Sequence, residues 1–313
     1  MKRAKVTVVG AGFVGATTAQ RIVEQQLADV VLVDVVDGLP QGKALDMAES
    51  ASLEGFDTRI VGTNDYRETQ ESDLILVTAG LARKPGMSRD DLLYKNAEIV
   101  SEIIKQASLY SPNSHIIMVT NPLDVMTHLA WKKSGFDSYR VFGMAGVLDS
   151  ARYSYFLAKE LDISPKDVRA MVLGGHGDSM VPLPNHSTVN GIPITQLIKP
   201  ERIEAINQRT RDGGAEIVNL LKTGSAFYAP SSAVCAMAEA VLLDTGRILP
   251  CCAYLSGQYG MKDVYCGVPV KLGRTGVQQI LELKLSPAEL ASLKKSAEGV
   301  RENIAKLSTK SFL

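Results

Sequence analysis

The first half of the chain alternates short, almost continuously apolar runs with longer stretches whose apolar residues recur every three or four positions. The short runs are typical of buried parallel strands, and the longer stretches are typical of helices packed on them. We predict strands at residues 5–10, 30–34, 59–62, 74–78, 116–120 and 140–142, with helices at 13–26, 39–53, 89–109 and 123–134. This strand-helix-strand order predicts an α/β fold with a doubly wound parallel sheet.

The pattern changes after residue 146. The second half predicts a helix at 149–161, a strand near 168–173, two helices between 200 and 244, and strands up to 283. A last helix begins after Ser286, with Pro287 at its first position and Glu289 completing a capping box. We therefore expect one domain over 1–146 and an α+β domain over 147–313, closely packed with a cleft between them.

Composition and charge narrow the class of partner. Of 313 residues, 34 are Lys or Arg and 34 are Asp or Glu, so no net charge favours nucleic acid or an anionic membrane. We expect a small-molecule partner, no nucleic acid and no membrane, because no apolar run is long enough to span a bilayer. The four cysteines lack the spacing of a metal or disulfide site and indicate a cytoplasmic protein without metal. The basic, then apolar N-terminus imitates an export signal, but it also fits a strand, a turn and a helix.

A glycine-rich turn follows the first predicted strand directly. Gly10, Gly12 and Gly15 form a complete GxGxxG at the start of the first predicted helix. In a Rossmann-type sheet, such glycines permit the tight turn, the approach of a pyrophosphate and the close packing of helix on strand. Asp34 ends the second strand, nineteen residues after Gly15, where a carboxylate accepts hydrogen bonds from an adenosine ribose. These features predict NAD rather than NADP, since the 2′-phosphate of NADP would be repelled by the Asp34 carboxylate. The alternative for the glycine-rich segment is a purely structural turn without a cofactor.

Ligands of such sheets bind beyond the carboxyl ends of the strands, so the loops after the fourth and fifth strands are the next candidates. The first loop holds the cations Arg83, Lys84 and Arg89, and the second holds Asn121 before Pro122. Solvated surface charge is the alternative for the cations. A plain helix cap is the alternative for the second loop, with Asn121 as the cap and Pro122 at the first helical position.

Three further residues are candidates for catalysis or substrate binding. Asp149 and Arg152 are three apart on a predicted helix and therefore share one side of it, as a surface ion pair also would. His176 lies among glycines in GGHGDS, directly after a predicted strand, where the backbone can approach a ligand closely. The other histidines, His115 and His128 on predicted elements and His186 beyond them, are expected to be structural.

Together these segments resemble the lactate and malate dehydrogenase family, and within it the lactate-dehydrogenase-like type that acts on malate. The resemblance covers nearly the whole chain and rests on GAGFVG, Asp34, RKPGMSR, TNP, LDSAR and GGHGDS, all in the family's order. It implies an NAD-dependent oxidoreductase that reversibly oxidises (S)-malate to oxaloacetate, with a place in the tricarboxylic acid cycle. It also implies a homodimer or homotetramer, with residues 147–313 binding the substrate.

The resemblance assigns roles to individual residues. It implies that His176 accepts the proton in alcohol oxidation and that Asp149 orients the ring and stabilises the imidazolium. Arg152 is implied to hold the C1 carboxylate through two parallel hydrogen bonds, and Arg89 to polarise the carbonyl when its loop closes. Asn121 is implied to contact both substrate and cofactor. The full set of implied cofactor contacts is Gly10, Ala11, Gly12, Phe13, Val14, Gly15, Asp34, Asn96, Val119, Thr120 and Asn121.

The loop cation Arg83 favours malate over lactate. It stands where malate-oxidising members carry arginine and lactate-oxidising members carry glutamine. With Arg83, Arg89, Arg152 and protonated His176 against Asp149, a closed site holds three net positive charges, of which oxaloacetate removes two and pyruvate one. Leaving Arg83 buried without a carboxylate costs several kcal/mol, which predicts a preference for oxaloacetate on the order of 10³.

Two alternatives to this function stay open. Lactate or another 2-hydroxy acid is the first; Arg83 argues against it, as does Ala226, which stands where lactate-oxidising members carry threonine and leaves room for a longer acid. The neighbouring Lys84 qualifies this argument, because the conformation of the loop decides which cation faces inward. A non-catalytic NAD-binding protein is the second, and the presence of both His176 and Arg152 argues against it.

Overall fold

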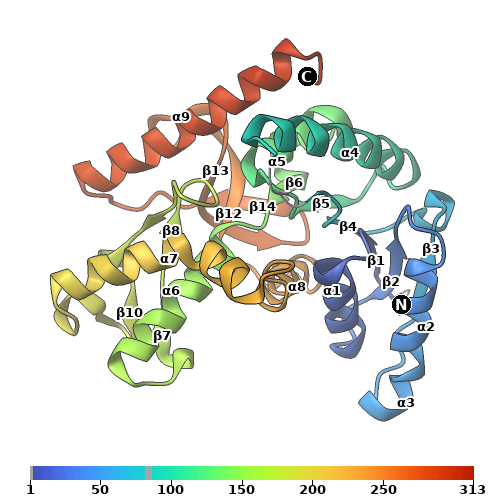
Figure 1. Cartoon of the computed structure of the whole chain (residues 1–313), viewed down its shortest axis with the longest axis horizontal. Coiled ribbons are helices and arrows are strands. Elements are labelled where there is room, and N and C mark those ends of the chain that lie inside the picture. Colours follow the sequence, from blue (N-terminus) through green and yellow to red (C-terminus); the bar gives the residue numbers. More distant parts are fainter. Residues whose placement is uncertain (1–2, 82–86) are drawn as a thin grey trace.

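One sheet organises the molecule, with helices covering both of its faces (Figure 1). The structure is a computed structural model that describes residues 3–81 and 87–313. Within these residues the main sheet has nine strands in the order β14-β13-β12-β6-β5-β4-β1-β2-β3. The last six positions are the doubly wound order that the sequence predicts, with all six strands parallel.

The parallel strands form where the apolar runs predict them. Each is short, and all but the edge strand β3 are buried over most of their length; β4, for example, is buried along its whole length. The strands are β1 (Lys5–Val9), β2 (Asp29–Val33), β3 (Ile60–Thr63), β4 (Leu74–Val77), β5 (His115–Met118) and β6 (Val141–Gly143). The helices between them are α1 (Phe13–Glu24), α2 (Leu39–Glu49), α3 (Ala51–Glu54), α4 (Arg89–Tyr110) and α5 (Leu123–Ser134), so the predicted helix at 39–53 is two helices, divided at Ser50.

The second half contains both long helices and short strands. Its helices are α6 (Gly146–Leu161), α7 (Pro200–Leu221), α8 (Tyr228–Leu242) and α9 (Pro287–Thr309). Its strands are β7 (Val168–Arg169), β8 (Val172–Leu173), β9 (Val181–Pro182), β10 (Thr188–Val189), β11 (Ile192–Pro193), β12 (Arg247–Ser256), β13 (Lys262–Gly273) and β14 (Gly276–Ile280). The single strand predicted near 168–173 is wrong: β7 pairs with β10 and β8 pairs with β9, in separate sheets. The break falls at Met171, whose N–H donates to the Ser187 hydroxyl at 3.1 Å instead of to a strand.

The last three strands extend the sheet of the first half. Cys252 of β12 pairs antiparallel with Gly143 of β6, and β13 and β14 follow as antiparallel neighbours. This pairing satisfies backbone groups that β6 would otherwise leave unpaired at an edge. One hydrophobic core consequently runs from Val6 in β1 to Leu307 in α9. The two halves of the chain thus share one sheet and this core, while a second cluster of buried apolar side chains, including Tyr153, Val172 and Ile206, lies within the second half.

Helix α9 spans the outer side of the molecule near α4 and α5 (Figure 1). Its predicted capping box is confirmed: the Ser286 hydroxyl accepts from the Glu289 N–H, and the Glu289 carboxylate accepts from the Ser286 N–H. Near its other end, Lys306 donates to Asp90 in the first turn of α4 at 2.6 Å. Along the described ranges, none of the helices has the length and apolar character needed to cross a membrane.

Candidate active site

The candidate residues converge where β1, β4 and β5 end. The Thr78 hydroxyl, just after β4, donates to the Gly10 carbonyl beyond β1 at 3.1 Å. The Thr120 hydroxyl, beyond β5, donates to the Ala79 carbonyl at 2.6 Å. These contacts tie three loops together at the carboxyl edge of the sheet, which is where open α/β sheets bind their ligands.

The glycine-rich turn has the geometry of a phosphate cradle. Gly10 has φ +102°, and a Cβ there would lie 2.7 Å from the Ala79 nitrogen. A Cβ on Gly15 would collide with the Gly10 carbonyl, whereas Gly12 faces open space. Gly12 caps α1 without a side chain, so the first N–H groups of the helix, beginning at the exposed Phe13, remain available for an anion. The turn therefore fits a dinucleotide pyrophosphate.

Asp34 is held beside this turn. Its Oδ2 accepts from the Ala11 N–H at 2.6 Å and its Oδ1 from the Val36 N–H at 3.0 Å. Each oxygen keeps a second lone pair, so the carboxylate can still accept a ribose hydroxyl. Sequence reasoning missed Lys43 of α2, which donates to the Ala11 carbonyl at 2.7 Å and lies over the Phe13 ring.

The loops after β4 and β5 are cross-linked by Asn96. This side chain of α4 is fully buried, accepts from the Leu81 N–H at 2.8 Å and donates to the Asn121 carbonyl at 2.7 Å. Its amide is thus engaged within the protein, and direct contact with a cofactor stays a prediction for it. The capping prediction for the second loop is wrong, because α5 begins at Leu123 with Pro122 in the cap position and no side-chain cap. The Asn121 side chain is consequently not needed to cap the helix.

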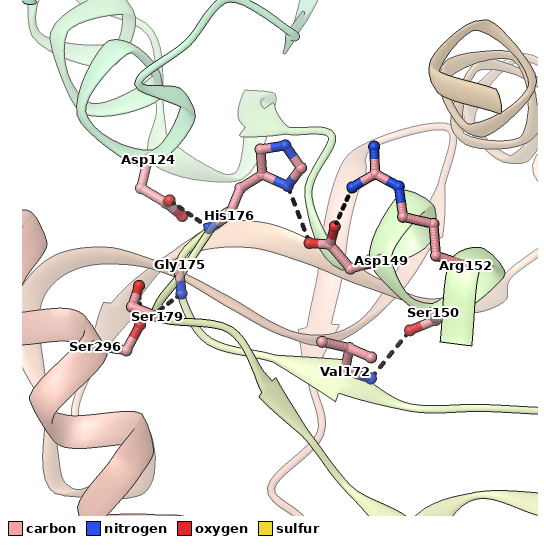
Figure 2. Close-up of polar contacts among 9 residues, drawn as sticks. All are labelled: Asp124, Asp149, Ser150, Arg152, Val172, Gly175, His176, Ser179 and Ser296. Carbon is pink, nitrogen blue, oxygen red and sulfur yellow. Dashed lines mark hydrogen bonds and ion pairs between the residues drawn. The ribbon is translucent and has the colours of Figure 1, made fainter. Parts of the chain in front are cut away.

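His176, Asp149 and Arg152 form a buried cluster (Figure 2). The Asp149 carboxylate lies 3.0 Å from Nδ1 of His176 and 3.4 Å from Nη1 of Arg152, and Figure 2 shows the two cations approaching it from two sides. The exposed fraction of the side chain is 2% for Asp149, 13% for Arg152 and 16% for His176. Helix α6 presents Asp149 and Arg152 on one side, as their spacing predicts, and the loop after β8 brings His176 to them.

The cluster tunes both of its cations. Burial disfavours the imidazolium of His176, but the charge and hydrogen bond of Asp149 outweigh burial, so the pKa of His176 is raised. Burial lowers the pKa of Arg152, against the opposing charge of Asp149. Nε of Arg152 is buried and has no hydrogen-bond partner among the residues the structure describes. One carboxylate thus cannot neutralise both Arg152 and a protonated His176, and Arg152 keeps a donor without a partner among the described residues.

Arg89 stands at the rim of this cluster. It is the first residue of α4, and its guanidinium lies 3.3 Å from Asp178 in the loop that also carries His176. Both side chains are largely exposed, so this pair is weak and can open to a substrate. Arg83 and Lys84 lie outside the described residues. Ala226 is half-buried in the segment between α7 and α8.

The remaining histidines occupy other surroundings. His128 is buried and its ring contacts those of Trp131 and Tyr265; burial, with the charge of Lys132, lowers its pKa to about 4. Burial also lowers the pKa of His115. Sequence reasoning overlooked Asp124, whose carboxylate accepts from the His176 N–H at 3.0 Å. Its position in the first turn of a helix at the carboxyl edge of the sheet was the available signal.

The fold and the site together define an α/β oxidoreductase with a dinucleotide site beside a histidine acid-base group. Residues 4–143 match the model of the lactate/malate dehydrogenase NAD binding domain, and residues 146–311 match that of the family's alpha/beta C-terminal domain. The chain belongs to the lactate/malate dehydrogenase family.

Within this family, the chain is similar to both malate and lactate dehydrogenases. The malate dehydrogenase of Pelodictyon phaeoclathratiforme is 58% identical over 306 residues, which cover 97% of this chain and 99% of that protein. The malate dehydrogenase structure from Salinibacter ruber has 54% identity and a TM-score of 0.94, covering 97% of this chain and 98% of that one. A lactate dehydrogenase from Cryptosporidium parvum, solved with lactic acid and NAD, has 41% identity and a TM-score of 0.95, covering 98% and 99%.

Proposed function

We propose that this chain is an NAD-dependent malate dehydrogenase that interconverts (S)-malate and oxaloacetate. The observation that carries the proposal is the buried His176, whose Nδ1 is hydrogen-bonded to Asp149 beside a guanidinium with an unpartnered Nε. A histidine base whose pKa is raised by a neighbouring carboxylate, and a cation that can bind a carboxylate, are the two groups needed to oxidise a 2-hydroxy acid.

The protein's part in the reaction follows from these contacts. Asp149 accepts from Nδ1–H of His176, which leaves the lone pair of Nε2 free to take the hydroxyl proton of malate. Asp149 then stabilises the imidazolium, and Arg152 holds the C1 carboxylate so that the hydroxyl faces Nε2. The glycine turn at 10–15, Asp34 and the ends of β4 and β5 would hold NAD, which supplies hydride transfer when bound.

The choice of malate rests on relatives and on charge. The malate dehydrogenases compared above are more similar to this chain in sequence, at 58% and 54% identity, than the lactate dehydrogenase is, at 41%. Lactate remains the second candidate, because Arg152 is the only buried cation found beside His176 in the described ranges, and one cation serves either acid. Arg83 supplies the second cation for the distal carboxylate in our proposal, and Ala226 the space for it.

The setting of the enzyme is also proposed. Residues 1–146 form the nucleotide-binding domain and 147–313 the substrate domain. We infer a homodimer or homotetramer in the cytoplasm, acting in the tricarboxylic acid cycle. Sedimentation at micromolar concentration tests the assembly, and a monomer would count against it.

The activity is tested by following NADH oxidation with oxaloacetate and pyruvate side by side, and then NADPH with the better acid. We expect fast turnover confined to oxaloacetate and NADH. Preference for pyruvate would keep the fold and the histidine chemistry but overturn the substrate. Absence of turnover with either acid, with NADH binding intact, would instead identify a non-catalytic NAD-binding protein.

A further inference from the structure

The loop that carries His176 is anchored by three consecutive backbone N–H groups, each to a different element, and Figure 2 shows the bonds of the second and third, Gly175 and His176. The three hydrogen bonds are Gly174 N–H to the Gly267 carbonyl of β13 at 2.8 Å, Gly175 N–H to Oγ of Ser296 in α9 at 2.8 Å, and His176 N–H to Oδ2 of Asp124 in α5 at 3.0 Å. A loop residue tied at three successive positions has little freedom to rotate. The acceptors therefore fix where the imidazole points.

Asp124 is an unusual choice for one of these acceptors. Its exposed fraction is 5%, and within the described ranges its Oδ1 is buried without a nitrogen or oxygen partner. Burial raises the pKa of Asp124, while the Cys252 thiol and the His176 N–H oppose that effect. A buried carboxyl group costs far more to desolvate than an amide or a hydroxyl, either of which could accept one hydrogen bond. One hydrogen bond to the His176 N–H therefore does not account for a buried carboxyl group at this position.

A second role for the carboxylate is electrostatic. Its negative charge favours the protonated form of the His176 ring, in the same direction as Asp149. Ionisable groups near Asp124 come from three elements: His176 of the loop, Cys252 of β12 and Cys266 of β13. From α6, Asp149 and Arg152 act on His176 with opposite signs. Asp124 therefore acts on His176 from the side opposite α6.

We propose that Asp124 is a positioning residue for His176, fixing the backbone of the catalytic loop and supplying a second negative charge behind the imidazole. Ser296 has the first of these roles alone, because its hydroxyl is neutral. It also donates to the Ser179 hydroxyl at 2.9 Å, which closes the other end of the loop. This inference rests on the proposed function and deepens it: Asp124 and Ser296 both position the loop of the proton acceptor, and Asp124 alone adds a charge.

Three variants separate geometry from charge. Asp124→Asn keeps an acceptor for the His176 N–H and removes the charge, Asp124→Leu removes both, and Ser296→Ala removes a neutral anchor. Ser108→Ala is the matched control: Ser108 is half-buried near the end of α4, and its hydroxyl bonds to the Ile104 and Lys105 carbonyls of its own helix. Circular dichroism and NADH binding are measured for each, and neither should change in the control.

Two readouts decide the proposal. We expect kcat to fall about 10- to 100-fold in Asp124→Leu and by a smaller factor in Ser296→Ala, with the KM for NADH unchanged, because a misplaced base costs rate rather than cofactor affinity. In Asp124→Asn, the pH profile of malate oxidation and the ¹⁵N NMR titration of His176 should both move to lower pH. Ser296→Ala should leave that titration in place, since it removes no charge.

Specific results would overturn the inference. A folded Asp124→Leu with kcat within twofold of the parent would remove the geometric role, and an unshifted titration in Asp124→Asn would remove the electrostatic one. If Asp124→Leu does not fold, Ser296→Ala and Asp124→Asn carry the same two decisions. If the parent protein turns over neither acid, the proposed function fails, whereas the NMR titration still tests Asp124.

Discussion

Replacing Arg152 tests how the site recognises an acid. Nη1 of this guanidinium faces Asp149 at 3.4 Å, whereas Nε is buried without a partner among the described residues. A substrate carboxylate that accepts two parallel N–H donations would have to reach Nε and Nη2, the nitrogens that do not face Asp149. Arg152→Lys keeps the charge and Arg152→Leu removes it.

The structure sets the size of the expected loss. Lysine offers a single nitrogen to Asp149 and the substrate together, so at least one charge-assisted hydrogen bond of about 1.5–3 kcal/mol disappears. That corresponds to a fall in kcat/KM for oxaloacetate of about 10- to 150-fold. Arg152→Leu removes the whole partner of a buried carboxylate, at about 3–5 kcal/mol, or roughly 10²- to 10⁴-fold.

Steady-state kinetics with oxaloacetate, together with NADH titration by fluorescence, measure both effects. The matched control is Arg202→Lys on α7, where the guanidinium is largely exposed and donates to both carboxylate oxygens of Glu160. It should leave kcat/KM unchanged. The reasoning is refuted if Arg152→Lys keeps kcat/KM within threefold of the parent, or if NADH affinity falls as far as kcat/KM does.

Other substitutions test the remaining parts of the site. His176→Asn should retain NADH binding but lower kcat by about 10²- to 10⁴-fold, the usual contribution of a general base, and near-normal rates would dismiss it as the proton acceptor. Asp149→Asn should lower the pKa of His176, because Asp149 raises it. The acidic limb of the pH–rate profile of malate oxidation then moves to lower pH, and oxaloacetate reduction becomes slower at neutral pH. An acidic limb that does not move would contradict the role given to Asp149. Arg83→Gln should shift the ratio of kcat/KM values toward pyruvate, and an unchanged ratio would mean that another residue reads the distal carboxylate.

The doubly wound half of the fold could be predicted from the sequence because its strands are buried on both faces. Runs such as Leu74–Val77 have no polar alternation to confuse them with helices, and the glycine turn marks where the first helix begins. The split between β7 and β8 could not be predicted in this way. It depends on a hydrogen bond from Met171 to Ser187, sixteen residues away, which no local pattern records.

The candidate site divides along the same line. His176, Asp149 and Arg152 could be found because motif order and helical spacing are local properties of the sequence. The contacts of Asp124 and Ser296 with this loop could not, since 52 residues separate Asp124 from His176 and 121 separate Ser296 from Gly175; the place of Asp124 in the first turn of α5 was its local signal. The structural role of Asn96, whose side chain bonds to the loops after β4 and β5, also could not be predicted, because it depends on these two strands lying side by side.

The continuous sheet explains how two distant sequence motifs can act on one molecule. The loop of His176 is bonded to β13 through Gly174 and Gly267, and a Cβ on Gly267 would collide with the Gly174 carbonyl. β13 pairs with β12, β12 with β6, and β6 with β5, whose end leads to Asn121. The proton site and the proposed nucleotide site are consequently held in register by backbone hydrogen bonds across one sheet, rather than by contact between two independent halves.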